Sequence, residues 1–429
     1  MSRNLFPCPA TSPVAGADSA SLTYNIDVIT PMFGGSATAR KVDLDHPVRI
    51  SEIRGCLRFW WRATRGAGYD DAGTLRAREA EIWGSTKIPS ATHIELAITS
   101  NGQRCPAQGN PACAVYPFKG DNRNSPEDGL RGVGFVLNVH CPARIEKDVV
   151  AAVWAWVNFG GIGARTRRGA GALYCAREAP MNRDGVGTWL GAKVEELGLP
   201  TDLIHMKAWP LMLAAPGYRP WLSQPCRDGA AAWKQAVDLI SDFRQRVGTG
   251  RNAGPGPRPR RSRWPEADSL RALTGRAESA HNSSITLLTP ALEPGFPRAD
   301  LGLPLILKFY HDHYGDTPND CEITPMDPVR HVAAKRMASP VLLRPFKMQD
   351  GQFCAMAMRL HAPPPEGIAI KFADPAVGIP PGVVLDRGVL RGARLGGYPI
   401  SPMGGRSRRG SAVEALMVFA RQEGFQEVR

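Results

Sequence analysis

A stretch rich in glycine and arginine between residues 160 and 174, GGIGARTRRGAGALY, has the composition of a phosphate-binding loop. It holds five glycines and three arginines and no acidic residue. Glycine permits positive φ angles and close backbone approach, and arginine offers a planar fork of donors that suits phosphate. It is not a nucleotide P-loop, because it follows its helix and lacks a GKS or GKT end. The candidate RNA-binding residues are Gly160, Gly161, Gly163, Arg165, Arg167, Arg168, Gly169 and Gly171; the alternative is a flexible, solvated loop.

Further basic residues recur along a predicted helix, SEIRGCLRFWWRATR, which we expect Ser51 to cap. Arg54, Arg58, Arg62 and Arg65 line one face of this helix, and the first three are further candidate RNA contacts. A solvated face is the competing interpretation. The adjacent Trp60 and Trp61 are expected in the core rather than as platforms for stacked bases.

An acidic loop near the N-terminus offers an alternative chemistry. Asp43 and Asp45 with a divalent metal would assist attack on phosphate, and His46 would act as a base. This set predicts a metal-dependent endoribonuclease. The simpler interpretation is surface pairing of the two aspartates with Lys41 and Arg49, because an acidic loop without a paired ligand cluster is a weak catalytic signal.

The overall composition favours a polyanionic partner. The net charge is +13 and the pI is about 9.5, as in many nucleic-acid-binding proteins. The sequence has no apolar run long enough to span a membrane, so we expect no membrane partner. The nine cysteines form no CxxC pair, which fits reduced thiols in the cytoplasm. We expect no cofactor and no metal site.

The order of predicted elements in the first half positions the glycine loop between a helix and a strand. Alternating and helical patterns predict strands at 22–29, 93–99, 133–140 and 171–178, and helices at 51–65, 74–84 and 150–159. The order strand, helix, strand, strand, helix, strand is that of a ferredoxin-like (RRM-like) domain. The sequence lacks the aromatic signature by which RRM domains bind RNA.

The second half predicts another α+β unit. We expect a linker with a short helix at 180–202, helices at 230–247 and 412–422, and strands at 203–214, 301–310, 336–346 and 352–361. A basic tract at 248–263 is rich in proline and glycine, which discourages regular structure. The expected organisation is a loosely ordered segment at 1–20, one ferredoxin-like domain at 21–180, and a second at 181–429 that carries the basic tract as an insertion.

Several of these stretches together resemble the RAMP proteins of CRISPR systems. They are TPMFGG followed by ISEIRGCLRFWWRA, then GGIGARTRRGAG, then SRWPEADSLR with GLPLILKF and RMASPVLLRPF. The resemblance runs from about Leu22 to Phe346. It is greatest to the first subunit of the type III-B (Cmr) effector complex, because the RFWWR helix and the RWPE segment are more specific than the glycine loop.

The resemblance implies a fold, a role and partners. It implies two ferredoxin-like domains of the RAMP type and a non-catalytic subunit of an antiviral ribonucleoprotein. Such a subunit would grip guide RNA near its 3′ end and help to position target RNA, beside other RAMP subunits. The glycine loop and the arginines at 54, 58 and 62 match the family's basic regions. A purely structural assembly protein is a further alternative, although that role does not require arginine-rich stretches without acids.

Overall fold

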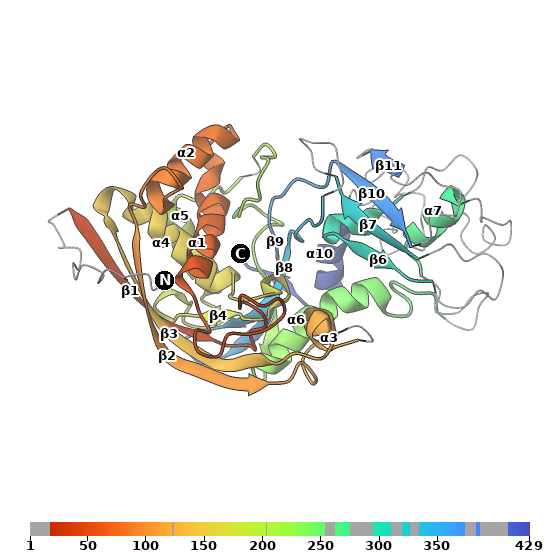
Figure 1. Ribbon diagram of the computed structural model, residues 1–429, viewed down its shortest axis with the longest axis horizontal. Helices are drawn as coiled ribbons and strands as arrows, with labels where there is room; N and C mark the ends of the chain where they lie inside the picture. The colour runs from red at the N-terminus through yellow and green to blue at the C-terminus, as the bar shows by residue number, and fades with distance from the viewer. Residues whose placement is uncertain are drawn as a thin grey trace, which may run out of the picture.

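The computed structural model describes residues 18–121, 124–202, 204–253, 262–274, 295–309, 320–326, 334–373, 383–386 and 411–429. Its first half is a ferredoxin-like unit (Figure 1). The elements are β1 (Ser19–Val28), α1 (Ile50–Arg65), α2 (Ala72–Trp83), β2 (His93–Cys105), β3 (Gly129–Pro142), α4 (Glu146–Phe159) and β4 (Leu173–Tyr174). The antiparallel sheet has the strand order β2-β3-β1-β4, which is the order that the split βαβ arrangement produces.

The second half contains the same topology, so the prediction of two ferredoxin-like domains is confirmed. Its elements are β5 (Trp221–Cys226), α6 (Gly229–Gln245), β8 (Val341–Lys347), β9 (Phe353–Arg359), α10 (Ala412–Gln422) and β12 (Gln426–Glu427). The antiparallel sheet has the order β12-β5-β9-β8. The helix α5 (Val186–Leu197) lies in the connection between the two units.

A third sheet interrupts the second unit twice. The chain leaves after α6 to form α7 (Glu266–Leu273), β6 (Leu305–Leu307) and β7 (Cys321–Pro325), and leaves again after β9 to form β10 (Gly367–Phe372) and β11 (Val383–Asp386). These strands make an antiparallel sheet of order β11-β10-β7-β6, at the end of the molecule away from β1 (Figure 1). The strand predicted at 301–310 therefore belongs to this sheet and not to the ferredoxin-like one. Residues 254–261 of the predicted basic tract lie outside the described residues.

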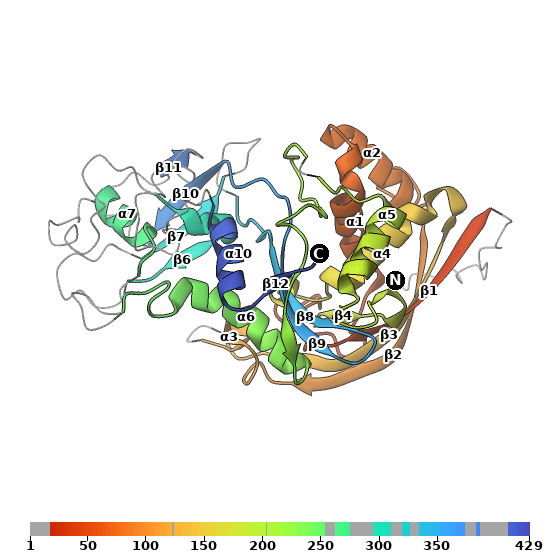
Figure 2. The ribbon, with the colours of Figure 1, turned by 180° about the vertical axis from the view of Figure 1, so that it is seen from behind.

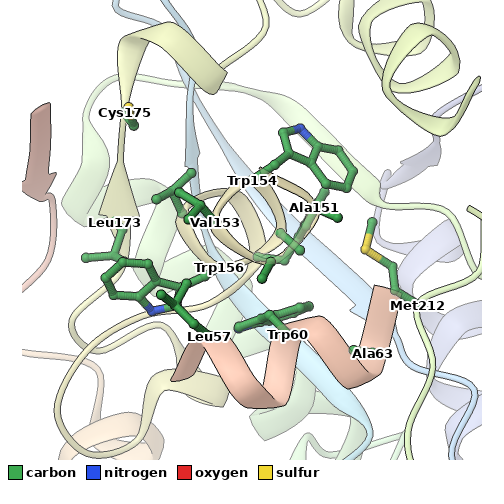
Figure 3. Packing of buried hydrophobic residues seen from close by; sticks show 14 of the residues in the cluster. Leu57, Trp60, Ala63, Ala151, Val153, Trp154, Trp156, Leu173, Cys175 and Met212 are labelled. Atoms are coloured by element: carbon green, nitrogen blue, oxygen red, sulfur yellow. The ribbon is translucent and has the colours of Figure 1, made fainter. Parts of the chain in front are cut away.

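The helix α4 explains how the two units are joined. All its residues from Ala151 to Phe159 are buried, as expected for a helix that is apolar all round. Its side chains pack with α1 on one side (Figure 3) and with one face of the second sheet, where the rings of Phe159 and Phe346 stack at 6.4 Å. The other face of that sheet packs on α6 and α10 (Figure 2). The two units thus share one hydrophobic core.

Several local predictions are settled by the structure. Trp60 and Trp61 are buried in the core, as predicted. The prediction that Ser51 caps α1 was wrong: the cap position is Arg49, whose side chain makes no capping bond. The segment 204–214 is not a strand and makes a single bridge, from Leu211 to His361.

Because β1 begins at Ser19, the expected loose segment is at least two residues shorter; residues 1–17 lie outside the described part. The domain bounds at 180 and 181 stay a prediction.

None of the helices in the described ranges is both long enough and apolar enough to cross a membrane.

Candidate nucleic-acid interface

The glycine loop packs against a second glycine-containing loop at the end of β1. The amide of Ala164 donates to the carbonyl of Phe33 at 2.7 Å, and the amide of Gly171 donates to that of Pro31 at 3.0 Å. A Cβ atom at Gly163 would lie 2.8 Å from the Phe33 carbonyl oxygen, so glycine is required for this approach. The TPMFGG and GGIGARTRRGAG segments therefore form one continuous surface.

A carboxylate from α1 fixes this double loop to the first helix. The amide of Gly163 donates to Oε1 of Glu52 at 2.6 Å. Burial raises the pKa of Glu52 above its ordinary value, an effect that the Gly163 bond and the charge of Arg49 oppose. The glycine loop thus has an acidic partner after all, but it comes from a distant part of the chain.

Of the three loop arginines, Arg165 is exposed to solvent. It has a left-handed φ of 64°, and its Nε and Nη2 donate to the carbonyls of Ala114 at 3.0 Å and Cys113 at 2.8 Å. These bonds hold the side chain over the short helix α3 (Ala112–Val115). A guanidinium carries five N–H donors, so Arg165 retains donors for an incoming phosphate.

The other two arginines of the loop face the second unit. Arg167 donates to the carbonyl of Ser339 and lies over the ring of Phe59 at 5.1 Å. Arg168 is only 8% exposed and donates to the carbonyl of Val341 at 3.1 Å. Burial lowers the pKa of each to about 10. In this structure both side chains join the loop to β8 and the segment before it, so their predicted role as RNA contacts is untested and competes with a structural one.

The remaining glycines of the loop allow the same close packing. Gly169 has a φ of 75°, and a Cβ atom there would lie 2.9 Å from the Leu343 carbonyl oxygen of β8. At Gly160 a Cβ would lie 2.5 Å from the indole nitrogen of Trp60. Gly161 and Gly171 approach each other across the loop. These glycines serve tertiary packing, whereas the sequence analysis attributed them to approach of RNA.

The predicted basic face of α1 lies against α2. Glu79 of α2 accepts from Arg58 at 2.7 Å and from Arg62 at 2.6 Å, and Arg54 donates to the Trp83 carbonyl at 3.2 Å. Arg58 and Arg62 remain about one-third exposed. Their role in RNA binding stays a prediction, and the pairing with Glu79 gives them a role in packing α2.

The residues of the nuclease alternative form a local turn. Oδ1 of Asp43 accepts the backbone amides of Asp45 at 3.2 Å and His46 at 2.9 Å, so this carboxylate oxygen is engaged by its own loop. Across the described ranges, no group of three or more His, Cys, Asp and Glu side chains is placed to hold a metal ion.

The structure also reveals an aromatic residue that the sequence analysis missed. Tyr116 is 68% exposed and follows α3, whose carbonyls Arg165 holds. Arg40 fixes the same segment by donating to the carbonyls of Pro117 at 2.9 Å and Ser125 at 2.8 Å. The segment 100–128 has no regular pattern, so only the fold shows that this residue follows a helix to which the glycine loop is bound.

Comparison with known proteins relates this region to one family. Residues 25–174, from β1 to β4, match the model of the RAMP superfamily. The chain is 28% identical over 171 residues to the CRISPR system Cmr subunit Cmr1-1 of Pyrococcus furiosus, covering 36% of this chain and 45% of that protein. It thus spans less than half of Cmr1-1. It is 24% identical over 176 residues to Cmr1-2 of the same organism, covering 35% of this chain and 92% of that protein.

Two solved structures are similar over a longer part of the chain. The crystal structure of Cmr1 from Pyrococcus furiosus in its apo form covers 81% of this chain and 90% of its own, with 17% identity and a TM-score of 0.48. A chain in the cryo-EM structure of the Type III-B Cmr-beta bound to cognate target RNA covers 80% of this chain and 95% of its own, with 11% identity and a TM-score of 0.43.

Proposed function

We propose that this chain, whose residues 25–174 match the model of the RAMP superfamily, is an RNA-binding subunit of a type III-B CRISPR ribonucleoprotein. The similarity to two Cmr subunits supports the proposal that the chain belongs to such a complex. The proposed partners are guide RNA, held near its 3′ end, target RNA, and other RAMP subunits of the complex. The proposed role in antiviral defence is non-catalytic.

The observation that carries the RNA-binding part is the position of Arg165. It is exposed, it is held by two backbone carbonyls, and it lies on the surface that the two glycine-containing loops share. A side chain fixed in this way loses little further freedom when it binds phosphate. The net charge of +13 adds long-range attraction for RNA.

The kind of contact determines what the subunit contributes. Arginine contacts to phosphate position an RNA strand without reading its bases. Sequence specificity would then come from pairing between guide and target, as in other RNA-guided systems. The subunit would hold the RNA strand and fix its position.

The test compares two neighbouring arginines of the loop in the full chain. Binding of a labelled single-stranded RNA is measured at several salt concentrations. Arg165→Ala should reduce the slope of log K against log salt by roughly 0.7, the value for one lost contact to a single strand. Arg168→Ala, which removes a buried charge, should leave the slope unchanged and lower the melting temperature. Arg76→Ala, on the exposed surface of α2, is the matched surface control.

Three results would contradict the proposal. They are no RNA binding by the wild type, an unchanged slope for Arg165→Ala, and a slope change for Arg76→Ala as large as that for Arg165→Ala. Membership of the complex is tested separately by a tagged pull-down: the proposal expects short guide RNAs with a common repeat-derived tag together with RAMP subunits.

A further inference from the structure

A second group of arginines lies where the glycine loop meets α6. The helix α3, which Arg165 holds, packs on α6 by burying Ala114 and Val115 against Trp233 and Val237. Arg244 follows Val237 by seven residues on α6, so it lies two turns further along the same face of the helix. It is half-buried. The sequence patterns did not single out Arg244.

The inserted segments bring two more arginines to this place. The indole of Trp264 donates to the backbone carbonyl of Arg244 at 3.1 Å, and the guanidinium of Arg298 lies over the Trp264 ring at 5.6 Å. Arg336, which is exposed, lies three residues before Ser339, the residue whose carbonyl Arg167 binds. The glycine loop, α6 and the inserted segments therefore all contribute positive charge to one region.

The charges of this region are unevenly compensated. Arg298 is paired with Glu266 at 3.1 Å. In contrast, the guanidinium groups of Arg244 and Arg336 make no hydrogen bond or ion pair within the described part of the chain. Burial lowers the pKa of Arg244 and the charges of Arg298 and Arg165 lower it further, whereas the charge of Glu266 opposes these effects. Burial lowers the pKa of Arg165, and the charge of Arg336 lowers it further.

Like charges on neighbouring elements repel one another, and salt screens this repulsion less where the groups are partly buried. Such an arrangement destabilises the folded chain until an anion occupies it, which is typical of sites kept for binding. The anion must reach several guanidinium groups on different elements, so a chain of phosphates fits better than a single ion.

We propose that Arg165, Arg244 and Arg336 form one binding site for successive phosphates of an RNA strand, which extends the interface from the glycine loop onto α6 and the segment before β8. This inference rests on the proposed RNA-binding function. The inference adds a direction to that function: the RNA strand would run from the glycine loop across α3 toward the second unit.

The experiment uses the full-length chain and a labelled single-stranded RNA long enough to cover both loop and helix. The double variant Arg244→Ala/Arg336→Ala should reduce the salt slope by roughly 1.4, at about 0.7 for each contact. Between 50 and 200 mM salt the wild type should then lose about sevenfold more affinity than the variant. The matched control is Arg76→Ala/Arg144→Ala, which removes the same charge from exposed positions on α2 and before α4.

The outcomes separate this inference from the proposed function. If the wild type fails to bind RNA, the proposed function fails. If the wild type binds and Arg165→Ala reduces the slope, but the double variant matches its control, only the extended site is overturned. Thermal unfolding distinguishes a structural role: the double variant should melt at the same temperature as the wild type or higher, since repulsion is removed, and a loss of several degrees would contradict the proposal.

Discussion

Arg344 of β8 donates a hydrogen bond to the carbonyl oxygen of Gly160 at 2.6 Å, across the boundary between the two ferredoxin-like units. Arg168 of the glycine loop donates in the opposite direction, to the carbonyl of Val341 in β8. The glycine loop and β8 each contribute an arginine that donates to the backbone of the other segment. The glycine loop is a joint between the two halves of the molecule, and its exposed edge at Arg165 is the part of the loop that we propose to bind RNA.

The first prediction concerns that joint. Arg344 is 1% exposed and donates to the carbonyls of Val157, Gly160 and Leu173. Its charge is held by carbonyl groups at the C-terminal end of α4, a favourable position for a cation. Arg344→Met keeps much of the volume but leaves buried acceptors without donors, so it should lower the free energy of unfolding by roughly 2–4 kcal/mol. Urea unfolding measures this.

Arg76→Met, at an exposed position on α2, is the control for Arg344→Met and should change the free energy of unfolding by less than about 0.5 kcal/mol. Equal stabilities for the two variants would show that the buried arginine does not hold the units together.

A second prediction separates backbone strain from close approach. Gly169 and Gly132 both have left-handed φ angles, of 75° and 77°, but a Cβ at Gly169 would collide with β8, whereas one at Gly132 meets nothing within 4 Å. Gly132→Ala should cost about 1–2 kcal/mol from its φ angle alone. Gly169→Ala should cost about 1–3 kcal/mol more, as overpacking does. Equal losses in the free energy of unfolding, measured with urea, would mean that β8 shifts to make room for the Cβ atom without an energetic cost.

Much of the fold could be predicted from the sequence because its signals are local. The alternation of residues 22–29, the apolar run that ends at Phe159 and the helix at 412–422 each occur within one element. The strands β5 and β12 could not be found in this way, since β5 contains a proline and β12 has only two residues. The third sheet pairs strands from two separate insertions, a relation that no local pattern contains.

The site was harder to predict because its residues have partners from distant segments. The glycine loop contains no acid, yet Glu52 reaches it from α1, and Glu79 of α2 pairs with the arginines of α1. The need for glycine at positions 163 and 169 comes from the Phe33 and Leu343 carbonyls. Composition alone does not distinguish a glycine that admits RNA from one that admits another part of the same chain.

A third prediction concerns pH. Because burial raises the pKa of Glu52 in the folded chain above its ordinary 4.5, the folded state binds more protons than the unfolded state between the two values. Stability should therefore fall as pH rises through that window. Glu52→Gln retains an oxygen for the Gly163 amide but has no charge to bury. Its stability relative to the wild type should increase from pH 4.5 to pH 8, as measured by melting temperature.

The control for this pH dependence is Glu195→Gln, at an exposed position of α5. The difference in melting temperature between this variant and the wild type should stay nearly constant over the same pH range. A Glu52→Gln curve parallel to that of the wild type would contradict a buried, destabilising carboxylate at the joint of the two loops.

A fourth prediction assigns a stacking role to Tyr116, whose ring is 68% exposed beside the segment that Arg165 holds. A base stacked on an aromatic ring contributes about 1–3 kcal/mol, so Tyr116→Ala should weaken RNA binding roughly 5- to 150-fold. Tyr116→Phe should bind as the wild type does, because it keeps the ring. The salt slope should not change in either variant, since no phosphate contact is lost. A loss in both variants, or a changed slope, would show that the hydroxyl or the local fold matters and not the ring.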